Sequence, residues 1–104
     1  MIKLSYVTKN TSILNSGLHQ TDIDFSNFSP LEENDFFEID INDIIVRYFL
    51  PNNMTSDVFV EWLAVNLNIN ADFNDIATAS SNNNVLSITS KTIDELNINY
   101  DFNR

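Results

Sequence analysis

Residues 37–50 carry the sequence FEIDINDIIVRYFL, and residues 51–67 continue as PNNMTSDVFVEWLAVNL. The first segment alternates apolar and polar side chains and then becomes β-branched and aromatic, which is typical of β-strands. In the second segment, four large apolar side chains recur at helical spacing: Phe59, Trp62, Leu63 and Leu67. The two patterns predict a strand followed by a helix, and this change of period favours an α+β fold.

The clearest helix is expected at about residues 57–67, where Thr55 or Ser56 can cap its first turn. Just before it, residues 43–50 allow two structures. Because they are β-branched and aromatic, we expect the preceding strand to continue through them with a bulge near Asp43. The alternative is a helix over the same residues.

Shorter patterns predict the remaining elements. Further strands are expected at residues 2–8, around Ile13 and Leu14 with a return at Ser16 and Gly17, and at residues 22–25, 85–90 and 96–102. A short helix is expected to start at Ser29-Pro30-Leu31-Glu32-Glu33 and a helical turn within residues 71–79, with a polar loop at 80–84 and a turn at 92–95. Because most connections are too short for parallel crossovers, the sheet should be mainly antiparallel.

We therefore predict a small, mainly antiparallel sheet of four to five strands packed against one principal helix at about 57–67, in a single domain of residues 1–104. The chain has one glycine and 17 asparagines, so its turns should depend on Asn, Asp and Ser. It lacks cysteine, which excludes disulfides and thiolate metal sites. Without a signal peptide or an apolar run of about 20 residues, we expect a soluble cytoplasmic protein, in the host cytoplasm if a phage encodes it.

The chain is strongly acidic, with 15 Asp and Glu against 5 Lys and Arg and a formal net charge of −10. Such a charge repels nucleic acid and anionic membranes and attracts basic surfaces. Five scattered bases cannot follow a phosphate backbone, and one glycine cannot build a glycine-rich phosphate loop. We therefore expect no direct nucleic-acid partner, no membrane partner and no cofactor.

The chain offers no recognisable catalytic motif. His19 is the single histidine and no serine lies in a nucleophile-elbow pattern, so we interpret His19 as a surface side chain. Residues 38–42 imitate the start of a calcium loop, but Asp43 stands where that loop needs glycine and Phe49 where it needs glutamate. Paired acids would need to face each other across a cleft, which a chain this short rarely builds: Asp22/Asp24, Glu32/Glu33, Glu38/Asp40, Asp72/Asp75 and Asp94/Glu95. We expect neither an enzyme nor a metal site.

An uncompensated run of charge lies between Lys9 and Arg47. Its eight acids are the predicted partner-binding residues: Asp22, Asp24, Glu32, Glu33, Asp35, Glu38, Asp40 and Asp43. Strand residues two apart share a face at about 6.6 Å, which is close to two phosphate steps of about 3.4 Å in B-DNA. A row such as Glu38 and Asp40 could therefore present carboxylates where a nucleic-acid-binding protein expects phosphates.

In composition alone, the chain resembles the small acidic proteins of phages and mobile elements that imitate DNA and block defence nucleases, anti-CRISPR proteins among them. The resemblance implies an inhibitor that occupies a basic nucleic-acid-binding groove of a partner protein or nuclease complex without turnover. No motif is shared with these proteins, so no residue role carries over. The alternative is a structural or assembly subunit, such as a virion component or a homodimer, whose acids serve solubility.

Overall fold

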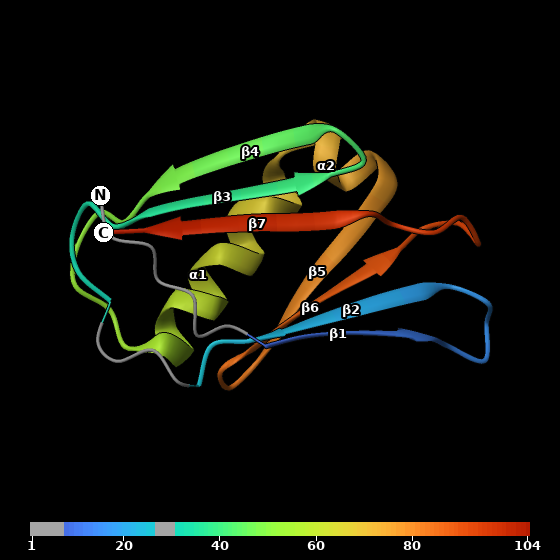
Figure 1. Cartoon of the computed structure of the whole chain (residues 1–104), viewed down its shortest axis with the longest axis horizontal. Helices are drawn as coiled ribbons and strands as arrows, with labels where there is room; N and C mark the ends of the chain where they lie inside the picture. Colours follow the sequence, from blue (N-terminus) through green and yellow to red (C-terminus); the bar gives the residue numbers. More distant parts are fainter. Residues whose placement is uncertain (1–7, 27–30) are drawn as a thin grey trace.

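The computed structural model describes residues 8–26 and 31–104. Within these residues, seven strands form two sheets and two helices pack beside them (Figure 1). The strands are β1 (Thr8–Ile13), β2 (His19–Asp24), β3 (Phe36–Ile41), β4 (Ile44–Phe49), β5 (Ala77–Asn82), β6 (Val85–Ser90) and β7 (Ile98–Asn103). The helices are α1 (Ser56–Ile69) and α2 (Ala71–Ile76).

Both sheets join strands that are distant in the sequence. The four-stranded sheet has the order β1-β2-β6-β5, the three-stranded sheet has the order β4-β3-β7, and every neighbouring pair is antiparallel. The predicted α+β class, with antiparallel strands and one main helix, is confirmed. The described residues contain more strands than the four to five expected, because segments predicted as a loop or as one long strand form hairpins.

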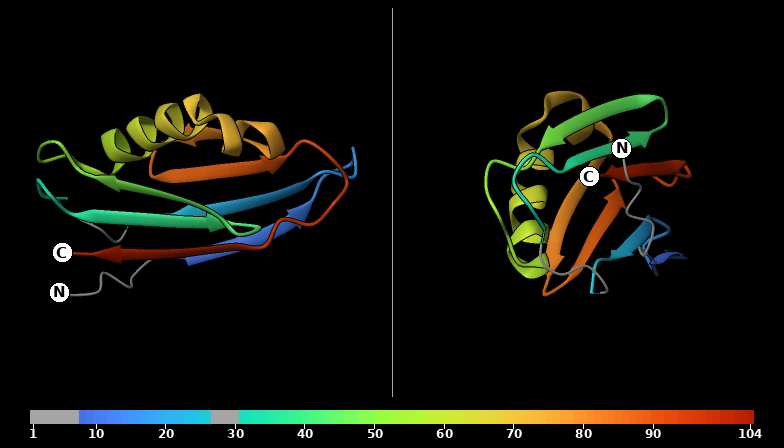
Figure 2. Two further views of the ribbon diagram at one scale, coloured as in Figure 1. Left: turned by 90° about the horizontal axis from the view of Figure 1, so that it is seen from above. Right: turned by 60° about the vertical axis from the view of Figure 1, so that its left-hand side comes forward.

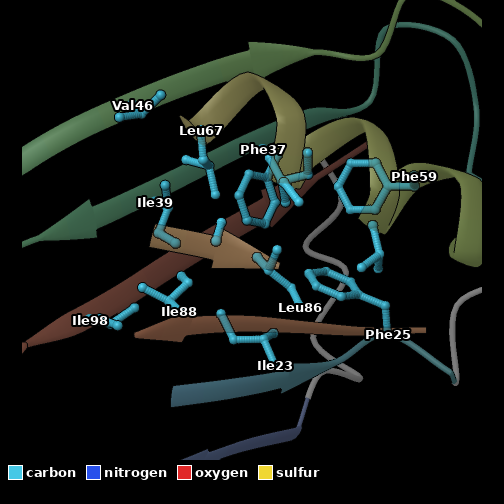
Figure 3. Packing of buried hydrophobic residues seen from close by; sticks show 14 of the residues in the cluster. Ile23, Phe25, Phe37, Ile39, Val46, Phe59, Leu67, Leu86, Ile88 and Ile98 are labelled. Atoms are coloured by element: carbon cyan, nitrogen blue, oxygen red, sulfur yellow. The ribbon is translucent and has the colours of Figure 1, made fainter. Parts of the chain in front are cut away.

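The two sheets and α1 enclose a shared apolar core, with α1 running along one side of the sheets (Figure 2). Buried residues alternate with partly exposed ones along β3 and β6 and through most of β2. Both sheets contribute core side chains that Figure 3 labels: Ile23, Leu86 and Ile88 from one, and Phe37, Ile39 and Ile98 from the other. Phe25 packs edge-on against Phe59 of α1 with ring centroids 5.3 Å apart. Because the inner faces share this core, the outer faces of the two sheets point away from each other.

Helix α1 packs against the side of the molecule where β4 is the edge strand of one sheet and β5 is the edge strand of the other. Towards β4, the Tyr48 ring meets Trp62 edge-on at 5.6 Å, and the Tyr48 hydroxyl donates to the Asn66 carbonyl oxygen. Towards β5, the Asn68 side chain donates to the Ala79 carbonyl oxygen and accepts from the Ala79 N–H. Asn68 therefore pairs both backbone groups of Ala79 at the edge of β5, as a residue of a neighbouring strand would.

Residues 43–50 supply a strand, as expected, but the feature near Asp43 is a turn and not a bulge. Asn42 and Asp43 have φ angles of 51° and 71°, and Ile41 pairs with Ile44, so the chain reverses through a two-residue hairpin of the I′ kind. The helix alternative for this segment is wrong. Two adjacent polar residues suit a bulge and a turn equally well, so the local pattern did not separate them.

The segment predicted as a polar loop at residues 80–84 belongs largely to a second hairpin. Strand β5 extends to Asn82, which pairs with Val85, so only residues 83–84 form the turn. This strand is rich in Ala and Ser, and its pairing with β6 and α1 holds it extended where local preference would not. The helical turn expected within residues 71–79 is α2, which ends where β5 begins.

The helix expected to start at residues 29–33 does not occur in the described part of that segment. Leu31 instead forms an isolated antiparallel bridge with Met54. Ser29 and Pro30 of that segment lie outside the described residues. The strand expected at residues 2–8 also lies outside them, except for Thr8, where β1 begins.

Asparagine and aspartate supply the left-handed turns, as the composition predicted. Among the described residues, the non-glycine positions with positive φ are Asn34, Asn42, Asp43 and Asn83. Gly17, with a φ of 85°, lies in the return between β1 and β2 that the break at Ser16 and Gly17 predicted. A Cβ atom at Gly17 would lie 3.3 Å from the Ile93 side chain, so both backbone and space favour glycine there.

Candidate functional site

The outer face of the three-stranded sheet brings together acids from two neighbouring strands. Glu38 and Asp40 alternate with buried residues along β3 and therefore point away from the core. The register places Glu38 beside Asp101 of β7 and Asp40 beside Asn99. On its other side, Glu38 is paired with Arg47 of β4.

These side chains surround a shallow hollow of about 120 Å³ on the outer surface, lined by Glu38, Asp40, Asn99, Tyr100 and Asp101. Asp43 lies in the adjoining hairpin turn, and its N–H donates to an Asp40 carboxylate oxygen at 2.9 Å. These four acids together are called the acidic sheet face: Glu38, Asp40, Asp43 and Asp101.

Arg47 of β4 forms an ion pair with Glu38 of the acidic sheet face. Its Nε donates to Glu38 Oε2 at 2.7 Å, while its side chain remains 60% exposed. An ion pair this exposed stabilises a fold by only about 0–1 kcal/mol. A cation from another molecule can therefore compete with Arg47 for the Glu38 carboxylate.

Asp22 and Asp24 lie on a different surface. They point outward from β2 in the four-stranded sheet, on the side of the molecule away from the acidic sheet face. Asp22 accepts hydrogen bonds from the Ser87 hydroxyl at 2.7 Å and from the Gln20 amide at 3.0 Å. Hydrogen bonds from the side chain and then the backbone N–H of Ser26 lower the pKa of Asp24. Both carboxylates therefore take part in local bonds of the four-stranded sheet.

Asp35 is part of the folded framework. Its side chain is 2% exposed, and its two carboxylate oxygens accept bonds of 3.0 Å from Nε and Nη2 of Arg104. The backbone N–H of Glu32 also donates to it, and the Glu32 carboxylate lies 3.4 Å from Arg104. Glu33 is exposed in the same turn. Asp35 thus stabilises the fold and is not accessible to a partner.

The eight acids predicted as partner-binding residues therefore do not share one surface. The structure brings Glu38, Asp40 and Asp43 together and places the other five elsewhere. It also adds Asp101, which lies outside the acidic run between Lys9 and Arg47. The alternation of residues 96–102 already indicated a strand with Asp101 on its polar side, but no local signal shows which strand β7 pairs with.

The described residues contain no group of three or more His, Cys, Asp and Glu side chains placed to hold a metal ion. His19 begins β2, where its backbone N–H donates to the Ser90 hydroxyl oxygen at 2.9 Å. In the same part of the chain, no helix combines the length and apolar character that crossing a membrane requires.

Comparison with known proteins gives no match to a family model, to a curated protein or to a solved structure. The acidic sheet face is a charged surface that the fold assembles from β3, β7 and the turn after β3.

Proposed function

We propose that this chain is a non-catalytic binding protein whose acidic sheet face docks onto a Lys/Arg-lined, nucleic-acid-binding groove of a partner such as a nuclease. The observation that carries the proposal is the convergence of Glu38, Asp40 and Asp101 on one outward-facing hollow. A groove that normally binds phosphates would meet carboxylates in their place.

The geometry of a sheet surface supports this role. Glu38 and Asp40 lie two residues apart on β3, a step of about 6.6 Å. Glu38 and Asp101 are opposite each other on neighbouring strands, where Cβ atoms are about 5 Å apart. The carboxylates therefore form a small two-dimensional array held by rigid strands. Arginine binds carboxylates and phosphates with the same pair of parallel hydrogen bonds, so such an array suits an arginine-lined groove.

The mechanism would be steric and electrostatic competition without turnover. The net charge of −10 attracts a basic partner over a distance and speeds the encounter, and salt screens this attraction. The exposed Glu38–Arg47 pair would open as a partner's cation takes the place of Arg47.

The test uses the full chain as immobilised bait in a bacterial lysate freed of nucleic acid, at low and high salt. We expect nucleic-acid-binding proteins to be captured at low salt, to be lost at high salt and to be displaced by added duplex DNA. A partner whose retention responds neither to salt nor to DNA would contradict the competitive mechanism.

A further inference from the structure

Helix α1 exposes an apolar surface on the side away from the core. Val58, Val65 and Ile69 are 49%, 57% and 75% exposed, and half-buried Trp62 lies between them. The opposite side of the same helix is already buried in the core. An ordinary surface helix is apolar on one side only, so a second apolar stripe indicates a second packing surface.

The spacing of this stripe is that of a helix-pairing seam. Residues 58, 62, 65 and 69 follow one another at intervals of four, three and four, which is the a/d pattern of coiled coils. Val58, Trp62 and Val65, together with Glu61, line a depression of about 330 Å³ that could receive side chains of a facing helix. We call the four apolar residues the α1 seam: Val58, Trp62, Val65 and Ile69.

The charge around the α1 seam favours a partner that is itself acidic. The chain carries 15 acids, yet Glu61 is the charged residue that lines the depression. The seam is flanked by the amides Asn66 and Asn68, which bond to α1 and β5. A basic partner would be better matched by acids at the rim, whereas a second copy with charge −10 can approach closely only where charge is scarce.

We propose that two copies of this chain form a homodimer by pairing their α1 seams in antiparallel fashion. Centred on the seam, this pairing sets Val58 against Ile69 and Trp62 against Val65 of the second copy. Glu61 comes level with Asn66, so the two Glu61 carboxylates stay about 7.5 Å apart along the axis at 1.5 Å per residue. The seam spans only three turns, so the Kd should be on the order of 10 μM, as for other small interfaces.

This dimer is independent of the partner-binding proposed above, because it uses α1 and not the acidic sheet face. The two also respond oppositely to salt. Salt screens attraction between the acidic sheet face and a basic partner, but it screens repulsion between two copies that each carry −10. Self-association should therefore strengthen as salt is raised.

The test is analytical ultracentrifugation of the full chain over a range of concentrations at low and high salt. We expect a monomer–dimer equilibrium that Val65→Glu weakens at least about tenfold, since it places two buried charges at the centre of the interface. Ile93→Glu is the matched control, because Ile93 is 72% exposed outside the seam and should leave the equilibrium unchanged. A monomer at all concentrations, or a dimer that Val65→Glu leaves intact, would overturn the proposal.

The absence of cysteine allows the orientation to be tested by cross-linking. Val58→Cys chains mixed with Ile69→Cys chains should oxidise to a mixed disulfide dimer, because antiparallel pairing brings these positions together. Val58→Cys alone should not cross-link, since the two copies of residue 58 would lie about 16 Å apart along the axis. Efficient cross-linking of Val58→Cys alone, or capture of a foreign protein by a chain that stays monomeric, would contradict antiparallel self-pairing.

Discussion

At the scale of single residues, the paired Asp35 and Arg104 show that an acid in an acidic run need not serve binding. Arg104 donates hydrogen bonds to both oxygens of the buried Asp35 carboxylate, and this bonding raises the pKa of Arg104. The Arg104 guanidinium therefore stays charged over the whole ordinary pH range. A carboxylate that is 2% exposed depends on these bonds, because burying a charge without a partner is costly.

Arg104→Gln should lower the free energy of unfolding by about 2 kcal/mol. The loss is smaller than for a fully buried pair, because the Arg104 side chain is 35% exposed and water can take part of its place. Urea unfolding measures it, with Arg47→Gln as the surface control, for which we expect a change within about 0.5 kcal/mol. Equal effects of the two changes would show that Asp35 does not need its cation.

Tyr48 makes the free energy of unfolding depend on pH in the alkaline range. Burial raises the pKa of its phenol above the ordinary value, so the unfolded chain ionises first as the pH rises through about 10 and native stability falls. Tyr48→Phe removes this loss, but it also removes the hydroxyl bond to the Asn66 carbonyl oxygen, at a cost of about 1 kcal/mol near neutral pH. Urea unfolding at about pH 7 and about pH 11 should show the deficit of the variant shrinking at the higher pH. A constant deficit would contradict the raised pKa.

At the scale of elements, the β3–β4 hairpin offers a direct test of its turn. Asp43 adopts a φ of 71°, where glycine is unstrained and where Asn-Gly is the preferred pair. Asp43→Gly should therefore raise the free energy of unfolding by about 0.5–1 kcal/mol. Asn42→Gly is the control: it relieves similar strain but loses the bond from the Asn97 N–H to the Asn42 side chain, so it should give no gain. Destabilisation by Asp43→Gly would contradict the turn geometry.

The elements with a strong period were predictable from sequence, and those defined by their neighbours were not. The helix at residues 57–67 and the strand at 85–90 were expected from local pattern, and the structure has them as α1 and β6. Strand β5 was missed because its sequence does not favour a strand. Its extended form depends on pairing with β6 and on the two bonds between the Asn68 side chain and Ala79. The turn at Asn42 was missed because two adjacent polar residues suit a bulge as well as a turn.

The candidate site was predictable only within one strand. Alternation correctly placed Glu38 and Asp40 on one side of β3. Adding Asp101 required the pairing of β3 with β7, and separating Asp22 required the assignment of β2 to the other sheet. Both are non-local facts, since strand order depends on the whole core and not on the charge of nearby residues.

At the scale of the whole molecule, a net charge of −10 coexists with two surfaces of opposite character. The acidic sheet face concentrates carboxylates, and the α1 seam is nearly free of charge. Partner binding and self-association should therefore be separable, because high salt weakens the first and strengthens the second. A dimer would also present two acidic sheet faces, which would increase avidity for a partner with two basic grooves.

The most direct measurement compares two charge reversals of equal size on opposite sides of the molecule. Glu38→Lys with Asp40→Lys changes the acidic sheet face, and Asp22→Lys with Asp24→Lys changes the four-stranded sheet. Each pair alters the net charge by +4, since two carboxylates are replaced by two ammonium groups, and circular dichroism checks that both variants fold. In titrations against a captured nucleic-acid-binding partner at low salt, the first pair should abolish binding while the second weakens it only modestly. Equal weakening by both pairs, or intact binding by the first, would contradict the assignment of partner binding to the acidic sheet face.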